Sequence, residues 1–308
     1  MTAARSLATI VVPASTSNLG PGFDALGLGL GLYLRAEVTA IVEDGLGHLR
    51  CTFAGPPPPG DNFIVTGFEA VARAVGATSV SSLDVTITCE IPPCAGLGSS
   101  AAALVAGGRL AALVLPGVTE AVLLDVITAI EGHPDNVAAA ILGGLVAACV
   151  RPDGHVVAAA SRWPDAVRLV VATPSQALLT KTARAVLPPH LPREDAIFNV
   201  QRVALLMQAV ATGRTDVLRE AFGDRLHQPY RAPLVPGLDA VLALQAPGML
   251  GAFLSGAGPS VAVCVGGDPA PVVDALRGVY ASIDPAVIIR VLDVHQPVSA
   301  APLAVSHG

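Results

Sequence analysis

A glycine-rich segment at residues 92–102, PPCAGLGSSAA, has a backbone suited to binding an anion. Glycine lets the main chain approach a ligand closely, and the helix predicted to follow presents free N–H groups and a positive dipole to a polyphosphate. The hydroxyls of Ser99 and Ser100 can reach a phosphate or a metal bound to it. The alternative is a tight turn that is capped by serine and binds no anion, because such a turn would contain the same residues. The segment differs from the G-x-x-x-x-G-K-[ST] loop because no lysine follows the glycines.

Two other glycine segments are candidates for ligand contact. Residues 13–24, PASTSNLGPGFD, place Asn18 and Asp24 where they can bind an amine and a hydroxyl, although an Asx-stabilised turn has the same composition. Residues 255–260, SGAGPS, lie between two apolar runs, so Gly256 marks either a bulge or space left for a ligand.

A polar cluster, EGHPDN at residues 131–136, follows a predicted helix. His133 is either a substrate contact or the organiser of this loop. Asp135, or Asp24, can take a proton from a hydroxyl, and Asp135 can equally cap a helix. His227 is predicted to be structural or to form part of a site wall.

Apolar periodicity and chain breakers predict the elements that hold these residues. Strands are expected at residues 7–12, 27–42, 83–91, 145–150, 156–160, 167–172, 251–254, 261–265 and 287–292. Helices are expected after a cap at Asp61 and at residues 99–115, 119–130, 180–186, 194–211, 215–222 and 269–280, with a short apolar helix between residue 136 and the turn at 143–144. The proline run at 55–60 predicts a rigid connector. The pattern indicates an α+β fold with domains at 1–163 and 164–308.

Composition narrows the class of protein. The 308 residues are 52% apolar and 14% charged, with no apolar run long enough to span a membrane and no secretory signal pattern at the start. A net charge of −6 without a basic run argues against nucleic acid as a partner. The five cysteines are scattered and odd in number, which argues against a disulfide framework or a zinc site. We expect a cytoplasmic protein that either is an enzyme acting on a small molecule or binds an ordinary protein partner.

Together the three glycine segments resemble, in order and spacing, the signature motifs of the GHMP kinases. Residues 18–24, 131–136 and 227–231 are similar to the homoserine kinases of that family in particular. The resemblance extends from about residue 11 to residue 263.

The resemblance implies a two-domain α+β GHMP kinase fold, with an N-terminal domain like ribosomal protein S5 domain 2 and a C-terminal ferredoxin-like domain. The site would lie in the cleft between them. The implied reaction transfers the ATP γ-phosphoryl group to the hydroxyl of homoserine, forming O-phospho-L-homoserine for threonine synthesis. ATP and Mg²⁺ are the implied cofactors, and a homodimer is the family expectation.

The resemblance also implies residue roles. Glu131, with Ser99 or Ser100, would hold Mg²⁺, and Asn62 would contact adenine. The loop around the phosphates would consist of Pro92, Pro93, Cys94, Ala95, Gly96, Leu97, Gly98, Ser99, Ser100, Ala101 and Ala102. The amino acid would be held by Asn18, Asp24, Thr180, Arg184, Arg231 and Gly256.

Physical chemistry supports this choice of substrate residues. An amino acid needs a carboxylate for its ammonium group and arginine forks for its carboxylate, and Asp24, Arg184 and Arg231 are of those types. Arg184 could instead be an ordinary basic residue on a solvent-facing helix.

The sequence departs from the family pattern at two places. Cys94-Ala95 stands where glycine and arginine are frequent, and Gly31 stands where an aspartate is common. The alternatives are a GHMP kinase for another hydroxylated metabolite, such as threonine, and a kinase-like regulatory protein without turnover.

Overall fold

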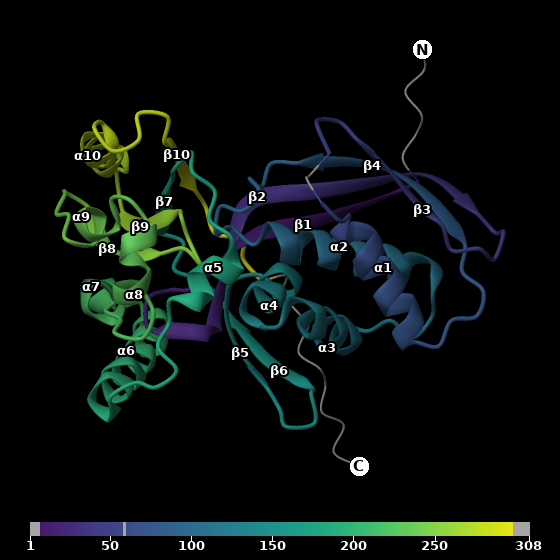
Figure 1. Cartoon of the computed structure of the whole chain (residues 1–308), viewed down its shortest axis with the longest axis horizontal. Coiled ribbons are helices and arrows are strands. Elements are labelled where there is room, and N and C mark those ends of the chain that lie inside the picture. Colours follow the sequence, from purple (N-terminus) through teal and green to yellow (C-terminus); the bar gives the residue numbers. More distant parts are fainter. Residues whose placement is uncertain (1–6, 58–59, 298–308) are drawn as a thin grey trace.

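The computed structural model describes residues 7–57 and 60–297, which form two β-sheets with helices packed against them (Figure 1). The first sheet has the strand order β3-β4-β2-β5-β6, with β1 paired to β2. Only the β3–β4 pair is parallel among these pairings. The strands are β1 (Ala8–Asn18), β2 (Gly22–Val42), β3 (Leu49–Phe53), β4 (Ser82–Cys89), β5 (Leu145–Val150) and β6 (Val156–Ser161).

Four helices pack on one face of this sheet (Figure 1). They are α1 (Phe63–Ala74), α2 (Ser99–Val114), α3 (Glu120–Glu131) and α4 (Asp135–Leu142). Glycine brings α1 and α2 into backbone contact, because a Cβ at Gly67 would lie 2.2 Å from the Leu104 carbonyl oxygen and one at Gly107 2.0 Å from that of Ile64. Larger residues at either position would push the helices apart.

The second sheet is antiparallel, in the order β10-β7-β9-β8. Its strands are β7 (Val167–Thr173), β8 (Met249–Leu254), β9 (Val261–Gly266) and β10 (Ile288–Leu292). The accompanying helices are α5 (Thr180–Ala185), α6 (Arg193–Thr212), α7 (Leu218–Ala221), α8 (Gln228–Arg231), α9 (Leu238–Leu242) and α10 (Ala270–Tyr280), with 3₁₀ turns η1 (Thr215–Val217) and η2 (Ala232–Leu234).

The hairpin between β1 and β2 reaches from the first half into the second. The carbonyl oxygen of Gly20 accepts a 2.7 Å hydrogen bond from Nε2 of His227, and that of Pro21 accepts one of 3.1 Å from Nδ2 of Asn199. A Cβ at Gly20 would lie 2.1 Å from the Phe222 carbonyl oxygen, so the turn sits directly on the backbone after α7. The two halves are therefore fastened together where the polar 13–24 segment lies.

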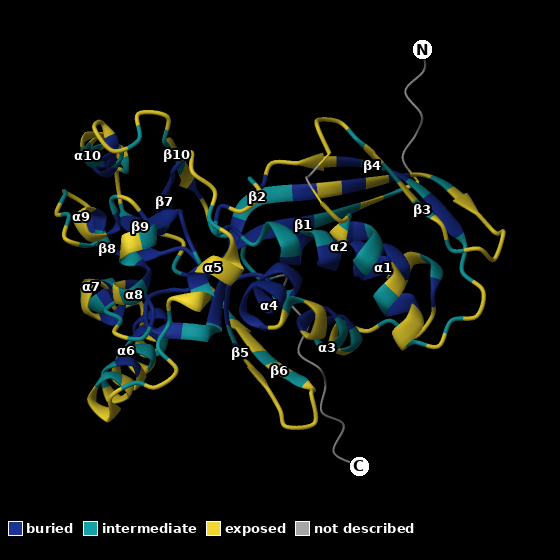
Figure 2. Ribbon diagram, in the orientation of Figure 1, coloured by how far each residue is buried: buried dark blue, intermediate teal, exposed yellow. Residues whose placement is uncertain are grey.

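Buried apolar residues form two clusters. The larger one fills the space between the first sheet and α1–α4 and continues to Phe222 and Phe253, while the smaller one, around Val263 and Tyr280, lies on the second sheet. Figure 2 shows this distribution, with α4 almost entirely buried and exposed residues at the outer turns. The hairpin, α4 and the second sheet thus share a buried junction.

Several predicted elements need correction. Residues 13–18 continue β1 instead of forming a loop, and the turn is confined to residues 19–21, because pairing with β2 satisfies this backbone. The cap of α1 is Asn62, whose Oδ1 accepts from Ile64 N at 3.1 Å, and not Asp61. Residues 215–222 divide into η1 and α7, and β3, α8 and α9 are elements that the sequence pattern did not predict.

The predicted α+β two-domain fold is confirmed, and the strands divide between the two sheets after Ser161 and before Val167. The boundary at 163/164 stays a prediction. Within residues 7–57 and 60–297, no helix is long and apolar enough to cross a membrane.

Candidate active site

The glycine loop connects β4 to α2 and has a left-handed backbone at three positions. The φ angles are 52° at Cys94, 74° at Gly96 and 68° at Gly98, which is the N-cap of α2. A Cβ at Gly96 would lie 2.3 Å from the Ser255 carbonyl oxygen, and one at Gly98 would lie 2.1 Å from Ser15 Oγ. Glycine is therefore required at both positions by conformation and by space.

The carbonyl groups of this loop are held by both halves of the molecule. Leu97 O accepts from Ser15 N at 3.2 Å, and Ala95 O accepts from Ser260 N at 3.3 Å. Gly96 O accepts from Ser255 Oγ at 2.7 Å. The first amides of α2 have no acceptor within the helix, so the loop offers N–H groups to an anion while its carbonyls are fixed.

The side chains of the loop differ in what they can contact. Those of Ala95, Leu97, Ala101 and Ala102 are buried in the core, so these residues can meet a ligand only through their backbone. Pro93 and Cys94 are exposed, whereas Pro92, Ser99 and Ser100 are partly buried. The Cys94 carbonyl accepts from Leu178 N at 3.3 Å, which ties the loop to the segment before α5.

A serine and a carboxylate meet at the N-terminus of α2. Ser100 Oγ donates a 2.6 Å hydrogen bond to Oε1 of Glu131, the last residue of α3. Two oxygen ligands of the kind that Mg²⁺ prefers are thus adjacent to the loop. Among residues 7–57 and 60–297, no group of three His, Cys, Asp or Glu side chains could hold a metal alone. A magnesium ion here would need further oxygen ligands, such as phosphates and water.

The hairpin places Asn18 and Asp24 together. Both have left-handed backbones, with φ of 68° and 55°. Asn18 Oδ1 accepts from Asp24 N at 3.1 Å, and its Nδ2 donates to Gly256 O at 2.8 Å. The Asp24 carboxylate accepts two bonds from Arg184, of 3.0 Å from Nη1 and 2.6 Å from Nη2. The hydrogen bond to Asp24 raises the pKa of Arg184.

Arg231 is buried beside this pair. It is 1% exposed, and its guanidinium donates from Nε to Ala183 O at 3.0 Å and from Nη1 to Gly256 O at 3.2 Å and His227 Nδ1 at 3.3 Å. Burial, with the positive charge of Arg184 adding to it, lowers the pKa of Arg231 to about 10. The guanidinium remains charged at neutral pH and interacts here with neutral acceptors.

His227 has a structural role, which is one of the two roles predicted for it. It is fully buried, with Nε2 donating to Gly20 and Nδ1 accepting from Arg231. Burial lowers its pKa, which agrees with a neutral ring that both donates and accepts. The residue connects Arg231 to the turn of the hairpin.

The segment between α3 and α4 contains a histidine–carboxylate pair. His133 Nδ1 lies 2.8 Å from Asp135 Oδ1, and Asn136 N donates to the same oxygen at 2.7 Å. Burial lowers the pKa of His133, but the hydrogen bond and the charges of Asp135 and Glu131 outweigh it and raise that pKa above 6.5. Asp135 is the first residue of α4 and not its N-cap, which is Pro134.

Asn136 and its serine partners are site residues that the sequence pattern did not predict. Asn136 Oδ1 accepts from Ser15 Oγ at 2.9 Å, and Asn136 Nδ2 donates to Ser17 Oγ at 3.0 Å. These bonds fix the orientation of the amide between the hairpin and α4. The available signal was a polar residue, adjacent to Asp135, at the start of an otherwise apolar helix.

Two other predicted contacts, Asn62 and Thr180, make no side-chain hydrogen bond to the site residues described above. Asn62 uses its amide oxygen to cap α1, and Thr180 is the exposed first residue of α5. Their roles toward adenine and substrate stay predictions. Gly31, where an aspartate is common, donates from N to Asp293 O at 2.9 Å, so this departure lies in a strand contact.

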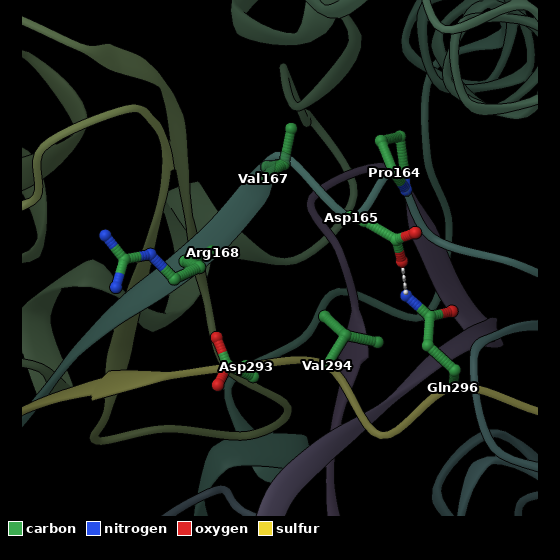
Figure 3. A pocket seen from close by; sticks show the side chains of 7 residues that line it. All are labelled: Pro164, Asp165, Val167, Arg168, Asp293, Val294 and Gln296. Atoms are coloured by element: carbon green, nitrogen blue, oxygen red, sulfur yellow. Dashed lines mark hydrogen bonds between the residues drawn. The ribbon is translucent and has the colours of Figure 1, made fainter.

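A separate cavity lies where β7 and the segment after β10 meet (Figure 3). Asp165 accepts a 3.1 Å hydrogen bond from Gln296 across it. The remaining lining residues are Pro164, Val167, Arg168, Asp293 and Val294. None of the predicted site residues lines this cavity.

Comparison with protein families identifies the chain. Residues 62–144 match the N-terminal domain of the GHMP kinases, and residues 206–282 match the C-terminal domain of the same family. The chain belongs to the GHMP kinase family, whose members use ATP.

Within that family, several relatives by sequence are homoserine kinases. One from Solibacter usitatus is 46% identical over 264 residues, covering 85% of this chain and 86% of the relative. One from Thermus thermophilus is 44% identical over 278 residues, covering 88% and 91%. The membership predicted from the motifs is confirmed.

Solved structures agree. The homoserine kinase of Cytophaga hutchinsonii superposes with a TM-score of 0.77 at 25% identity, covering 95% of this chain and 97% of that one. The mevalonate kinase of L. major superposes with a TM-score of 0.69 at 19% identity over 97% of this chain and 99% of that one, which shows the shared fold alone.

Proposed function

We propose that this protein transfers the γ-phosphoryl group of ATP to the hydroxyl of L-homoserine, forming O-phospho-L-homoserine. The observation that carries the proposal is the arrangement of Asp24, Arg184 and Arg231 around the hairpin turn, within reach of elements that hold the glycine loop. The names of the relatives by sequence agree with this substrate.

The charges of this group match an amino acid. Asp24 is the carboxylate for the substrate ammonium group, and the two arginines supply forks for its carboxylate. The hydrogen bonds of Arg231 go to neutral acceptors, although the charges of Asp24, Asp224 and Asp135 also act on it. Its guanidinium therefore has no bidentate carboxylate partner of its own, and a substrate carboxylate can take that place.

Substrate binding requires exchange of partners at Asp24. The Arg184 fork occupies both carboxylate oxygens in this structure, so an incoming ammonium group competes with Arg184 for Asp24. The substrate carboxylate would then replace Asp24 as the partner of Arg184. Asn18 stays in place during this exchange because Gly256 O and Asp24 N already hold its amide.

The glycine loop and α2 are the proposed nucleotide site. Phosphoryl transfer depends mostly on positioning and on neutralising phosphate charge, and backbone N–H groups at a helix start do both. Mg²⁺ would bind through Glu131 with Ser100 or Ser99, and its chemistry there is to neutralise phosphate oxygens. The adjacent Ser100 and Glu131 oxygens fit such an ion.

His133 is the proposed acceptor of the hydroxyl proton. Asp135 holds its Nδ1, which leaves Nε2 to face a substrate, and a pKa raised above 6.5 suits proton transfer near neutral pH. Asn136, fixed by Ser15 and Ser17, keeps the start of α4 aligned with the hairpin. Asp135 therefore orients His133 in this scheme, and Asp24 binds substrate.

ATP turnover with Mg²⁺ against homoserine, threonine, serine and mevalonate tests the function. We expect clear preference for homoserine by kcat/KM. Preference for another alcohol would replace the substrate and keep the kinase, and ATP binding without turnover on any of the four would favour a regulatory protein. The same preparation, examined by sedimentation and by cell fractionation, tests the expected homodimer and cytoplasmic location.

A further inference from the structure

The aromatic ring of Phe23 is surrounded by cationic and titratable groups of the proposed amino-acid site. Its centroid lies 5.4 Å from Cζ of Arg184 and 5.3 Å from Cζ of Arg231, and 5.4 Å from the ring centroid of His227. Both guanidinium distances are within the range in which a ring attracts a cation. One partly buried side chain therefore contacts both arginines.

The backbone at Asp24 explains how Phe23 and Asp24 reach the same arginine. In a regular strand, successive side chains point to opposite faces of the sheet. The left-handed φ of 55° at Asp24 interrupts that alternation near the start of β2. As a result Arg184 makes its two hydrogen bonds to Asp24 and also lies over the ring of Phe23.

The two arginines need such a neighbour because their charges repel. The positive charge of Arg184 contributes to the lowered pKa of Arg231. Arg184 has a carboxylate partner, whereas Arg231 donates to two carbonyl groups and to the neutral ring of His227. The negative face of an aromatic ring stabilises two nearby cations without neutralising them for a ligand.

We propose that Phe23 is a positioning residue of the amino-acid site, whose ring holds both guanidinium groups toward one substrate carboxylate. The proposal rests on the proposed function. The ring also stays beside Arg184 when a substrate ammonium group displaces Arg184 from Asp24, so that the freed guanidinium keeps its place. Phe23 acts through the arginines and takes no part in phosphoryl transfer.

The test compares Phe23→Leu and Phe23→Met, which remove the ring, with Phe23→Tyr, which keeps it. We expect KM for homoserine to rise roughly tenfold in Phe23→Leu and Phe23→Met. The KM for ATP should stay at the wild-type value, and kcat should change less than KM for homoserine. Phe23→Tyr keeps the ring and should keep a near-normal KM for homoserine. A role that depended on side-chain volume alone would predict a near-normal KM for Phe23→Met as well.

Phe198→Leu is the matched control. The Phe198 ring also lies beside two guanidinium groups, with Arg202 Cζ at 3.2 Å and Arg225 Cζ at 4.1 Å from its centroid, but these arginines pair with Glu220 and Asp195 and not with Asp24. This control should keep the wild-type KM for homoserine. It shows whether loss of any arginine–aromatic contact affects the kinetics.

Isothermal titration of homoserine without ATP provides a second measurement for variants that are less stable, each confirmed as folded by circular dichroism. If the wild type phosphorylates homoserine, and Phe23→Leu and Phe23→Met have the wild-type KM and affinity for homoserine, the proposal is overturned. The proposed function is then left intact. An equal rise of both KM values would also overturn it. A wild-type protein that neither binds nor phosphorylates homoserine would overturn the function itself.

Discussion

Ser100 and Glu131 are joined by a 2.6 Å hydrogen bond, although they are 31 residues apart in the chain. Ser100 lies in the first turn of α2, directly after the glycine loop, and Glu131 ends α3. Packing of α2 against α3 brings the hydroxyl and the carboxylate to one point. The proposed magnesium ligands are therefore positioned before a nucleotide or a metal arrives.

Removal of the Glu131 carboxylate should abolish most turnover. We expect Glu131→Ala and Glu131→Gln to lower kcat/KM by at least about 100-fold, because each loses a charged oxygen ligand for the metal that neutralises phosphate. Steady-state kinetics over a range of Mg²⁺ concentrations measures this. Chelation of the metal should silence the wild type as well. Wild-type rates in Glu131→Gln would remove this role from Glu131.

Replacement of the two arginines should separate binding from stability. Arg184→Leu and Arg231→Leu should both raise KM for homoserine, with little change in KM for ATP. Arg231→Leu should also destabilise the fold by about 1–3 kcal/mol per unpaired buried group, because Ala183 O and His227 Nδ1 lose this donor, whereas Gly256 O keeps its bond from Asn18. Arg184 is part-exposed, so its loss should cost less.

Thermal unfolding together with kinetics on both variants measures this contrast. If Arg231→Leu keeps the wild-type KM for homoserine while losing stability, Arg231 is structural and does not belong to the substrate site.

Gly96→Ala should damage the glycine loop more than its backbone angle alone explains. Gly96 and Gly117 have similar φ angles, 74° and 80°, but a Cβ at Gly96 would meet the Ser255 carbonyl at 2.3 Å, while one at Gly117 would meet nothing within 4 Å. Gly117→Ala should cost about 1–2 kcal/mol of unfolding free energy from strain. Gly96→Ala should cost more and should raise KM for ATP.

Chemical denaturation and ATP kinetics on the two variants provide the comparison. Equal losses of stability with unchanged KM for ATP would show that the contact between Gly96 and Ser255 does not shape the loop.

The His133–Asp135 pair should make part of the stability pH-dependent. The pKa of His133 is raised above 6.5 in the folded state, so the folded state retains the proton more strongly than the unfolded state. The stabilisation is fully present below about pH 6.5 and disappears as pH rises through the folded pKa. The unfolding free energy of the wild type should exceed that of His133→Gln most at low pH. This difference should shrink as the pH rises through the pKa of His133 in the folded state.

Denaturation of both proteins between pH 5 and 9 measures this difference, and Asp135→Asn should reduce it by removing the carboxylate. A difference that does not vary with pH would show that His133 has an ordinary pKa.

Local sequence patterns predicted those helices and strands that depend on residues only a few positions apart in the chain. The helices at 99–115 and 119–130 were predicted almost residue by residue, since glycine, alanine and a threonine at a helix start act within a few residues. Residues 13–18 were misassigned because β2 satisfies their backbone from a distance. The cap of α1 was assigned one residue early, since Asp61 and Asn62 are both good caps and only the path of the chain selects Asn62.

By itself the sequence determined the family and the types of residue that a phosphate and an amino acid require. The spacing of the glycines and the presence of acidic and basic residues can be seen without knowledge of the fold. Tertiary structure decided which of them meet. The fork of Arg184 on Asp24, across 160 residues, and the burial of Arg231 depend on the hairpin packing against α7 and α8. The local signal of Asn136 was only a polar residue at the start of an apolar helix, and Phe23 had none, because an amide and an aromatic ring acquire a role only from neighbours that folding places around them.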